Sequence, residues 1–84
     1  MSKARITTLD LHVAKRLRAA RVQRGLSQEK SGEAIGVSFQ QVQKYEKGTN
    51  RIAASKLFQL AVLYDMPIQW FFEDLDGRKK KPKP

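Results

Sequence analysis

The sequence contains no cysteine and a single histidine, His12. Without thiols the chain can form neither a disulfide nor a thiolate metal site, and one imidazole cannot assemble a metal cluster. We therefore expect no metal and no cofactor. The lack of disulfides favours a reducing, cytoplasmic location.

Long apolar runs and catalytic motifs are missing as well. No segment approaches the roughly 20 apolar residues of a membrane span, and the first residues do not form a signal peptide. There is no Gly-rich phosphate loop, and Asp74 and Asp76 lack basic partners for general acid catalysis. The sequence therefore predicts neither a membrane protein nor an enzyme.

Acidic residues are few, and they are unevenly placed. The 84 residues carry a formal charge of +9. Residues 1–51 hold eleven Lys and Arg against four Asp and Glu, residues 52–77 have a net charge of −3, and residues 78–84 add +5. A chain of this length suits one small domain, and a cationic half on such a domain predicts a polyanionic partner such as nucleic acid.

Residues 28–35 and 39–47 are predicted to form two short helices joined by a tight corner. Ser27 and Ser38 suit the N-caps, because a serine hydroxyl accepts a hydrogen bond from a first-turn N–H. Gly36 can take the positive φ that ends the first helix. We expect the two helices to approach most closely at Gly32.

The second helix of this pair has two different faces. Val42 and Tyr45 are three residues apart and form an inward apolar face. The outward face carries amides and ammonium groups, on Gln40, Gln41, Gln43, Lys44 and Lys47. Such a pair, with such a face, is typical of a helix-turn-helix that binds DNA. An ordinary corner between two helices of a bundle is the alternative.

Apolar residues at helical spacing predict three further helices, over residues 10–24, 54–64 and 67–75. Thr8 or Asp10 is expected to cap the first of them. In the second, Phe58, Val62 and Leu63 are expected to widen a buried stripe, and Asp65 is expected to take a positive φ at its end. The fold class is thus all-α, with five short helices.

Three runs, RLRAARVQRGLSQEK, GVSFQQVQKYEKG and LFQLAVLYDMP, resemble the phage-repressor-like helix-turn-helix family (Cro/C1, xenobiotic-response-element type). The resemblance covers residues 13–75, and its most specific pieces are Arg21–Gln28 and Tyr45–Gly48. It implies a compact, lambda-repressor-like bundle whose second and third helices bind DNA. It also implies a sequence-specific regulator of transcription, such as a repressor.

The resemblance further implies an ion pair between Arg21 and Glu46 beneath the corner. A guanidinium and a carboxylate near a core are tolerable only when they are paired; two unrelated surface charges are the alternative. Ser31 departs from the family, which usually has Leu there. We expect it to lose about 1–3 kcal/mol of apolar burial, offset by neighbours such as Phe58 or Phe39.

The third helix is expected to read bases with its first turns. Gln40 and Gln41 can each bond adenine N6 and N7, and Lys44 can donate to guanine O6 or N7. Phe39 either touches a thymine methyl group or packs back on the preceding helix.

Contacts to the DNA backbone should frame these base contacts. Gln28 opens a helix, where N–H groups and the helix dipole attract an anion, and its family counterpart binds the DNA backbone. The loop after residue 47 is polar and cationic, and family members use it for phosphate. The expected set is Gln28, Ser38, Gln43, Lys47, Thr49, Asn50 and Arg51.

The last helix is rich in apolar residues, and they cannot all turn inward. Exposed apolar surface marks partner sites, and this end often forms the two-fold contact in the family. We therefore expect a homodimer through Trp70, Phe72 and Leu75, on a near-palindromic site with recognition helices ~34 Å apart. Alternatively, Trp70 lies on its own protomer's core. A second functional interpretation is a protein-interaction module, an antitoxin or bridging factor, that acts through this helix.

We expect three parts along the chain: a flexible arm at 1–8, the DNA-binding domain at 9–76 and a disordered basic tail at 77–84. Lys3 and Arg5 in the arm are candidates for a phosphate or minor-groove contact. The tail either adds sequence-independent affinity for DNA or is a truncated linker.

Overall fold

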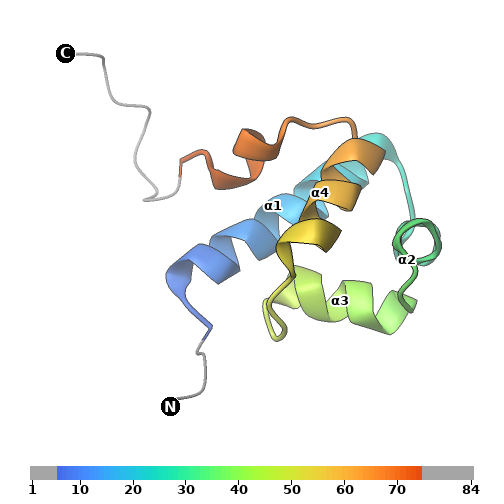
Figure 1. Ribbon diagram of the computed structural model, residues 1–84, viewed down its shortest axis with the longest axis horizontal. Helices are drawn as coiled ribbons and strands as arrows, with labels where there is room; N and C mark the ends of the chain where they lie inside the picture. The colour runs from blue at the N-terminus through green and yellow to red at the C-terminus, as the bar shows by residue number, and fades with distance from the viewer. Residues whose placement is uncertain (1–5, 75–84) are drawn as a thin grey trace.

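The computed structural model describes residues 6–74, and all regular structure in this range is helical (Figure 1). Its elements are α1 (Thr8–Arg24), α2 (Gln28–Ile35), α3 (Phe39–Lys47), α4 (Ala54–Leu63) and the short 3-10 helix η1 (Ile68–Phe72). In Figure 1, α3 lies along the lower edge and η1 along the upper edge, with α1 and α4 between them. The predicted all-α class is confirmed.

The expected fifth α-helix is a single 3-10 turn. Its N–H groups bond three residues back, from Trp70 to the carbonyl of Pro67 at 3.0 Å and from Glu73 to that of Trp70 at 3.4 Å. Glu73 is extended and Asp74 has φ 58°, so the turn cannot continue. Short pieces of this kind are the usual use of 3-10 geometry.

The first helix begins two residues earlier than predicted. The Thr7 hydroxyl accepts a bond from the Asp10 N–H at 3.2 Å, and the Asp10 carboxylate accepts one from the Thr7 N–H at 2.7 Å. This reciprocal capping box assigns the cap to Thr7 and makes Asp10 its partner, so the prediction of Thr8 or Asp10 as cap was wrong. Of the predicted arm and tail, residues 1–5 and 75–84 lie outside the described residues.

The corner between α2 and α3 is built as the sequence predicted. Ser27 and Ser38 accept bonds from the N–H groups of Lys30 and Gln41, at 2.9 and 3.1 Å. Glycine is needed at position 32, but not because two helices approach there, as we expected. A Cβ at this position would lie 2.5 Å from the Val37 carbonyl oxygen. The close approach is therefore to the backbone of the corner itself.

The core is formed by buried residues from α1, α2, α3, α4 and η1. It contains Leu17, Leu60, Tyr64 and Phe71, all fully buried. The predicted wide apolar face of α4 was wrong at two positions, because Phe58 and Val62 are 60% and 64% exposed. The inward stripe of this helix is narrow, at Leu57, Leu60 and Ala61, and Phe58 and Val62 lie one turn apart outside it.

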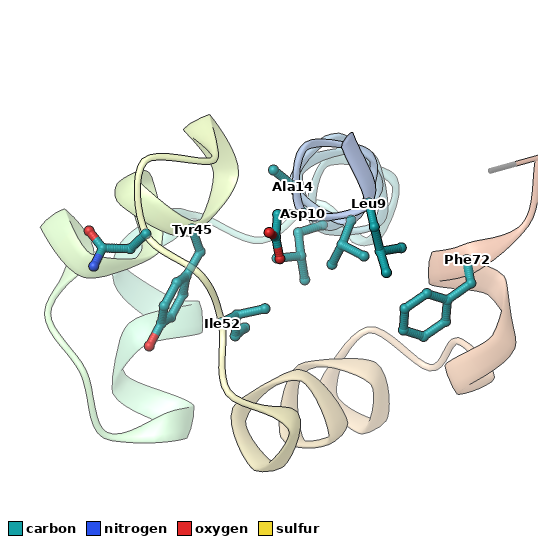
Figure 2. A pocket seen from close by; sticks show the side chains of 9 residues that line it. Leu9, Asp10, Ala14, Tyr45, Ile52 and Phe72 are labelled. Carbon is teal, nitrogen blue, oxygen red and sulfur yellow. The ribbon is translucent and has the colours of Figure 1, made fainter. Parts of the chain in front are cut away.

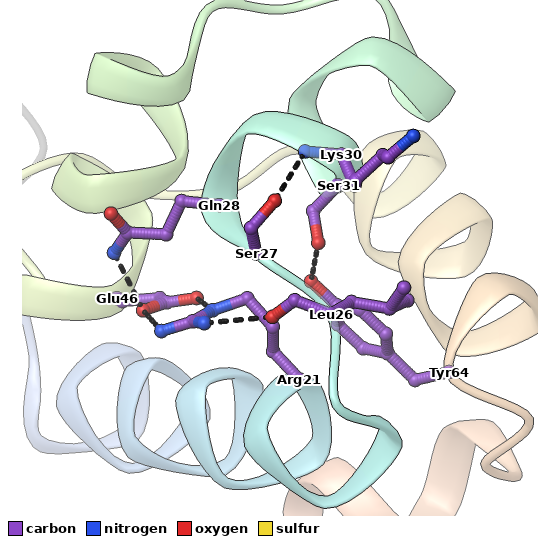
Figure 3. A network of polar contacts seen from close by, with 8 residues as sticks. All are labelled: Arg21, Leu26, Ser27, Gln28, Lys30, Ser31, Glu46 and Tyr64. Atoms are coloured by element: carbon purple, nitrogen blue, oxygen red, sulfur yellow. Dashed lines mark hydrogen bonds and ion pairs between the residues drawn. The ribbon is translucent and has the colours of Figure 1, made fainter.

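Ser31 is fully buried, and its compensation differs from the prediction. The Tyr64 hydroxyl donates to the Ser31 hydroxyl at 2.8 Å (Figure 3). The tyrosine ring from α4 therefore reaches under α2, and its hydroxyl satisfies the buried polar side chain at position 31. Phe58 is exposed and does not compensate. Asp65 has φ 58°, which confirms the predicted left-handed conformation after α4.

Candidate nucleic-acid interface

The outward face of α3 carries polar side chains that bond to nothing else in the described part of the chain. Gln40 and Lys44 are one turn apart and exposed, and Gln41 is half-buried beside them. Within residues 6–74, none of these three side chains has an intramolecular hydrogen bond or ion pair. Their amide and ammonium groups are thus available to an external partner. Phe39 is half-buried at the start of α3, which both of its expected roles allow.

Beneath this face, Arg21 of α1 and Glu46 of α3 form a two-bond ion pair (Figure 3). Nε and Nη2 of Arg21 lie 2.7 and 3.1 Å from the two carboxylate oxygens. The two side chains are only 13% and 4% exposed. The hydrogen bond to Glu46 raises the pKa of Arg21, so the guanidinium remains charged. This is the pair that the sequence predicted, and it fastens the underside of α3 to α1.

Two further groups complete this network. Nη1 of Arg21 donates to the Leu26 carbonyl at 2.9 Å, and the Gln28 amide donates to Glu46 at 3.1 Å. Gln28 is half-buried. The residue that we expected at the DNA backbone therefore also braces the carboxylate that supports α3.

The loop after α3 is bonded to the end of that helix. The backbone N–H groups of Thr49 and Asn50 lie 3.1 and 3.3 Å from the Lys44 carbonyl oxygen, and the Thr49 hydroxyl lies 3.3 Å from it. Lys47, Thr49 and Asn50 are exposed. The expected phosphate-binding residues of the loop thus stay at a fixed place beside α3.

Arg51, at the end of this loop, bonds to Asp10 in the first turn of α1. Its Nε lies 3.2 Å from each carboxylate oxygen, and its Nη2 lies 3.2 Å from Oδ2. The N–H of Thr7 is the main cause that lowers the pKa of Asp10, and the bond from Arg51 lowers it further. This pair could not be predicted from the sequence, because its members are 41 residues apart.

A cavity of about 120 Å³ lies between α1, the loop and η1 (Figure 2). The side chains labelled around it are Leu9, Asp10, Ala14, Tyr45, Ile52 and Phe72. Most of the residues that line it are apolar, and Asp10, Tyr45 and Asn50 are the polar ones. Among residues 6–74 no three His, Cys, Asp or Glu side chains gather closely enough to hold a metal ion, and no helix is long and apolar enough to span a bilayer.

Arg16 fastens η1 to α1, a role that sequence reasoning missed. Its Nε and Nη2 donate to the Trp70 carbonyl at 2.9 and 2.7 Å, and its guanidinium lies 4.0 Å from the centre of the Trp70 ring. His12 donates to the Glu73 carbonyl at 2.7 Å. Trp70 is therefore held on its own protomer, whereas Phe72 is 39% exposed. Leu75 lies outside the described residues.

Comparison with known proteins identifies relatives of this chain. The sequence profile of a helix-turn-helix family matches residues 17–71. An uncharacterized HTH-type transcriptional regulator of Sinorhizobium medicae is 47% identical over 76 residues, which cover 90% of this chain and 55% of the relative. An uncharacterized transcriptional regulator in the ATPase CF(0) region of Rhodospirillum rubrum is 50% identical over 68 residues, 81% of this chain and 63% of the relative. The chain thus spans between half and two thirds of these relatives.

Solved structures agree on the fold. The restriction-modification controller protein C.AhdI of Aeromonas hydrophila has a TM-score of 0.69 and 27% identity, over 74% of this chain and 94% of that one. The clp gene regulator ClgR of C. glutamicum has a TM-score of 0.75 over 82% of this chain and 90% of its own, with 19% identity, and supports the fold alone. The chain therefore belongs to the Cro/C1-type helix-turn-helix family, and the relatives named here are transcriptional regulators.

Proposed function

We propose that this protein is a sequence-specific regulator of transcription that binds double-stranded DNA and reads the major groove with α3. One observation carries the proposal: the exposed polar face of α3 lies opposite a buried face that is fixed to α1 by an ion pair. A helix held in this way can enter a groove without losing its place in the fold. The regulator names of the relatives support the same class of function.

Base readout is assigned to the first turns of α3. Gln40 and Gln41 can each bond adenine through N6 and N7, and Lys44 can donate to guanine; a good bidentate pair discriminates by about 1–3 kcal/mol. Phe39, half-buried at the start of the helix, is assigned to a thymine methyl group.

Phosphate contacts are assigned in two groups. Those on the exposed surface are Lys47, Thr49 and Asn50, with the half-buried Gln43 on the flank of α3. Gln28, Ser38 and Arg51 already form hydrogen bonds within the fold. Each would have to bind a phosphate in addition to its present partner, or in place of it.

The domain is proposed to act as a homodimer on a near-palindromic site. Phe72 supports this contact through its exposed ring, with Ile68 exposed close by. Trp70 contributes less than we first expected, because Arg16 already covers it. A cytoplasmic location belongs to this proposal, since the protein must reach DNA; no cofactor, metal or membrane enters it.

Selection of binding sites from random duplexes by the whole chain tests the proposal. Gln40→Ala and Lys44→Ala should each weaken the preference for the selected duplex over a random one by about tenfold. This corresponds to a loss of about 1.4 kcal/mol in discriminating binding free energy. Gln59→Ala, on the exposed surface of α4, is the matched control and should keep the preference. Unchanged discrimination in both α3 variants would refute the assignment.

The alternative is a protein-interaction module. It is favoured by the exposed Phe58 and Val62, which line a shallow apolar surface with Ala34 and Leu63. This surface lies on α4 and α2, not on the last helix that the sequence indicated. If the selection enriches no duplex, this alternative becomes the leading one.

A further inference from the structure

Asp10 is an acidic side chain bonded to the loop of the proposed DNA surface. The basic half of the chain has four acidic residues. Glu46 is neutralised within the fold by Arg21. Asp10 instead bonds to Arg51, one of the residues assigned above to phosphate.

The carboxylate of Asp10 is fixed in position. Oδ2 accepts bonds from the Thr7 N–H at 2.7 Å and from the Thr7 hydroxyl at 2.9 Å. The group also lies in the first turn of α1, where the helix dipole favours a negative charge. It cannot move aside for a phosphate without breaking the cap of α1.

The edge of Arg51 that faces Asp10 is the edge that a phosphate would use. Nε and Nη2 form the fork that binds carboxylate or phosphate with two parallel bonds, and both are directed at Asp10. The Arg51 side chain is nevertheless 44% exposed. The loop that carries it is tied to the Lys44 carbonyl, so Arg51 stays beside α3.

We propose that Asp10 competes with DNA phosphate for Arg51 and thereby limits the sequence-independent affinity of the domain. This inference rests on the proposed DNA-binding function. A phosphate that approaches Arg51 must share its fork with a fixed carboxylate, and the two anions repel within the screening distance of about 10 Å at 0.1 M salt. Because phosphates carry no sequence information, the effect is the same on every duplex.

Asp10→Asn tests the inference, because Asn keeps an oxygen for the cap and loses the charge. Fluorescence anisotropy would follow binding to the selected duplex and to a random one over a salt series. We expect about three- to tenfold tighter binding to both at ~0.1 M salt, and a log K against log salt slope that is steeper by about 0.9 per protomer. Glu73→Gln is the matched control, because it removes an equal charge from the Arg16 pair on η1.

Arg51→Gln completes the design. In the Asp10→Asn background it should abolish the gain, so that it weakens binding several-fold more there than in the native background, where Asp10 already reduces the contribution of Arg51. Unchanged or weaker binding of folded Asp10→Asn, or an equal gain in Glu73→Gln, would overturn the inference. If Asp10→Asn does not fold, Arg51→Gln is compared with Lys47→Gln, at an exposed cation of the same surface, and a loss of affinity as large for Arg51→Gln as for Lys47→Gln would overturn the inference. If the native chain binds no duplex, the proposed function fails first, and this inference with it.

Discussion

Ser31 and Tyr64 should be strongly coupled in stability. Ser31→Ala would leave the buried Tyr64 hydroxyl without its acceptor, and Tyr64→Phe would leave the Ser31 hydroxyl without its donor. An unsatisfied buried hydroxyl costs about 1–3 kcal/mol, whereas replacing both partners by apolar groups can be nearly neutral. We therefore expect each single variant to lose about 1–3 kcal/mol and the double variant to lose less than the sum by at least about 1 kcal/mol.

Urea and thermal unfolding would measure this cycle. For a domain of this size, 1 kcal/mol corresponds to about 4–8 °C in Tm. Ser55→Ala, at an exposed serine of α4, is the control and should stay within about 0.5 kcal/mol of the native chain. Single effects that simply add in the double variant would show that the two hydroxyls do not depend on each other, and would refute the compensation.

Three other predictions concern charge, pH and assembly. Glu46→Ala should cost about 3–5 kcal/mol in urea unfolding, because it leaves a guanidinium buried; a loss below about 1 kcal/mol would contradict the network. Burial raises the pKa of Tyr64 above its unfolded value of 10.0. The neutral Tyr64 side chain therefore contributes fully to the free energy of unfolding below pH 10, and this contribution is lost as pH rises through the folded pKa. Tyr64→Phe should therefore unfold at a higher pH, in an alkaline titration, than its free energy of unfolding at pH 7 would suggest. In sedimentation, Phe72→Ser should dissociate the dimer and Phe58→Ser should not; the reverse result would move the contact to α4, and a monomeric native chain would exclude the dimer.

The parts of the fold that were predictable are those whose signals are local. The bounds of α2 and α3 agree with the prediction, because Ser27, Gly36 and Ser38 mark them within the same few residues. The polar face of α3 followed from periodicity in the same way. The start of α1 was misplaced because Thr7, Thr8 and Asp10 are all residue types that suit an N-cap, and only the reciprocal bonds between Thr7 and Asp10 select Thr7 over the predicted Thr8 or Asp10.

The contacts that the sequence could not reveal join residues far apart along the chain. Arg16 meets Trp70 across 54 positions, and Arg51 meets Asp10 across 41. No periodic pattern links such positions, and each side chain alone is an ordinary surface charge. The exposure of Phe58 could not be predicted either, since α4 has apolar residues on more than one face and only the packing of its neighbours decides which face is buried.

The separation of support from recognition in α3 leads to a last prediction. A helix of nine residues is too short to be stable alone, since isolated helices below about 12–15 residues are marginal in water. Its stability must come from its cap, from the buried Val42 and Tyr45, and from Glu46 beneath. Gln40 and Lys44 take no part in these contacts.

Gln40→Ala and Lys44→Ala should therefore change the free energy of unfolding by no more than about 0.5 kcal/mol while they weaken discrimination between duplexes. Val42→Ala, on the same helix, should instead lose about 1–3 kcal/mol of stability. The Val42→Ala variant should still prefer the selected duplex over a random one at temperatures where it is folded. If the two outward substitutions destabilise the domain as much as Val42→Ala does, the outward face also supports the fold, and a loss of discrimination could no longer be assigned to base contacts.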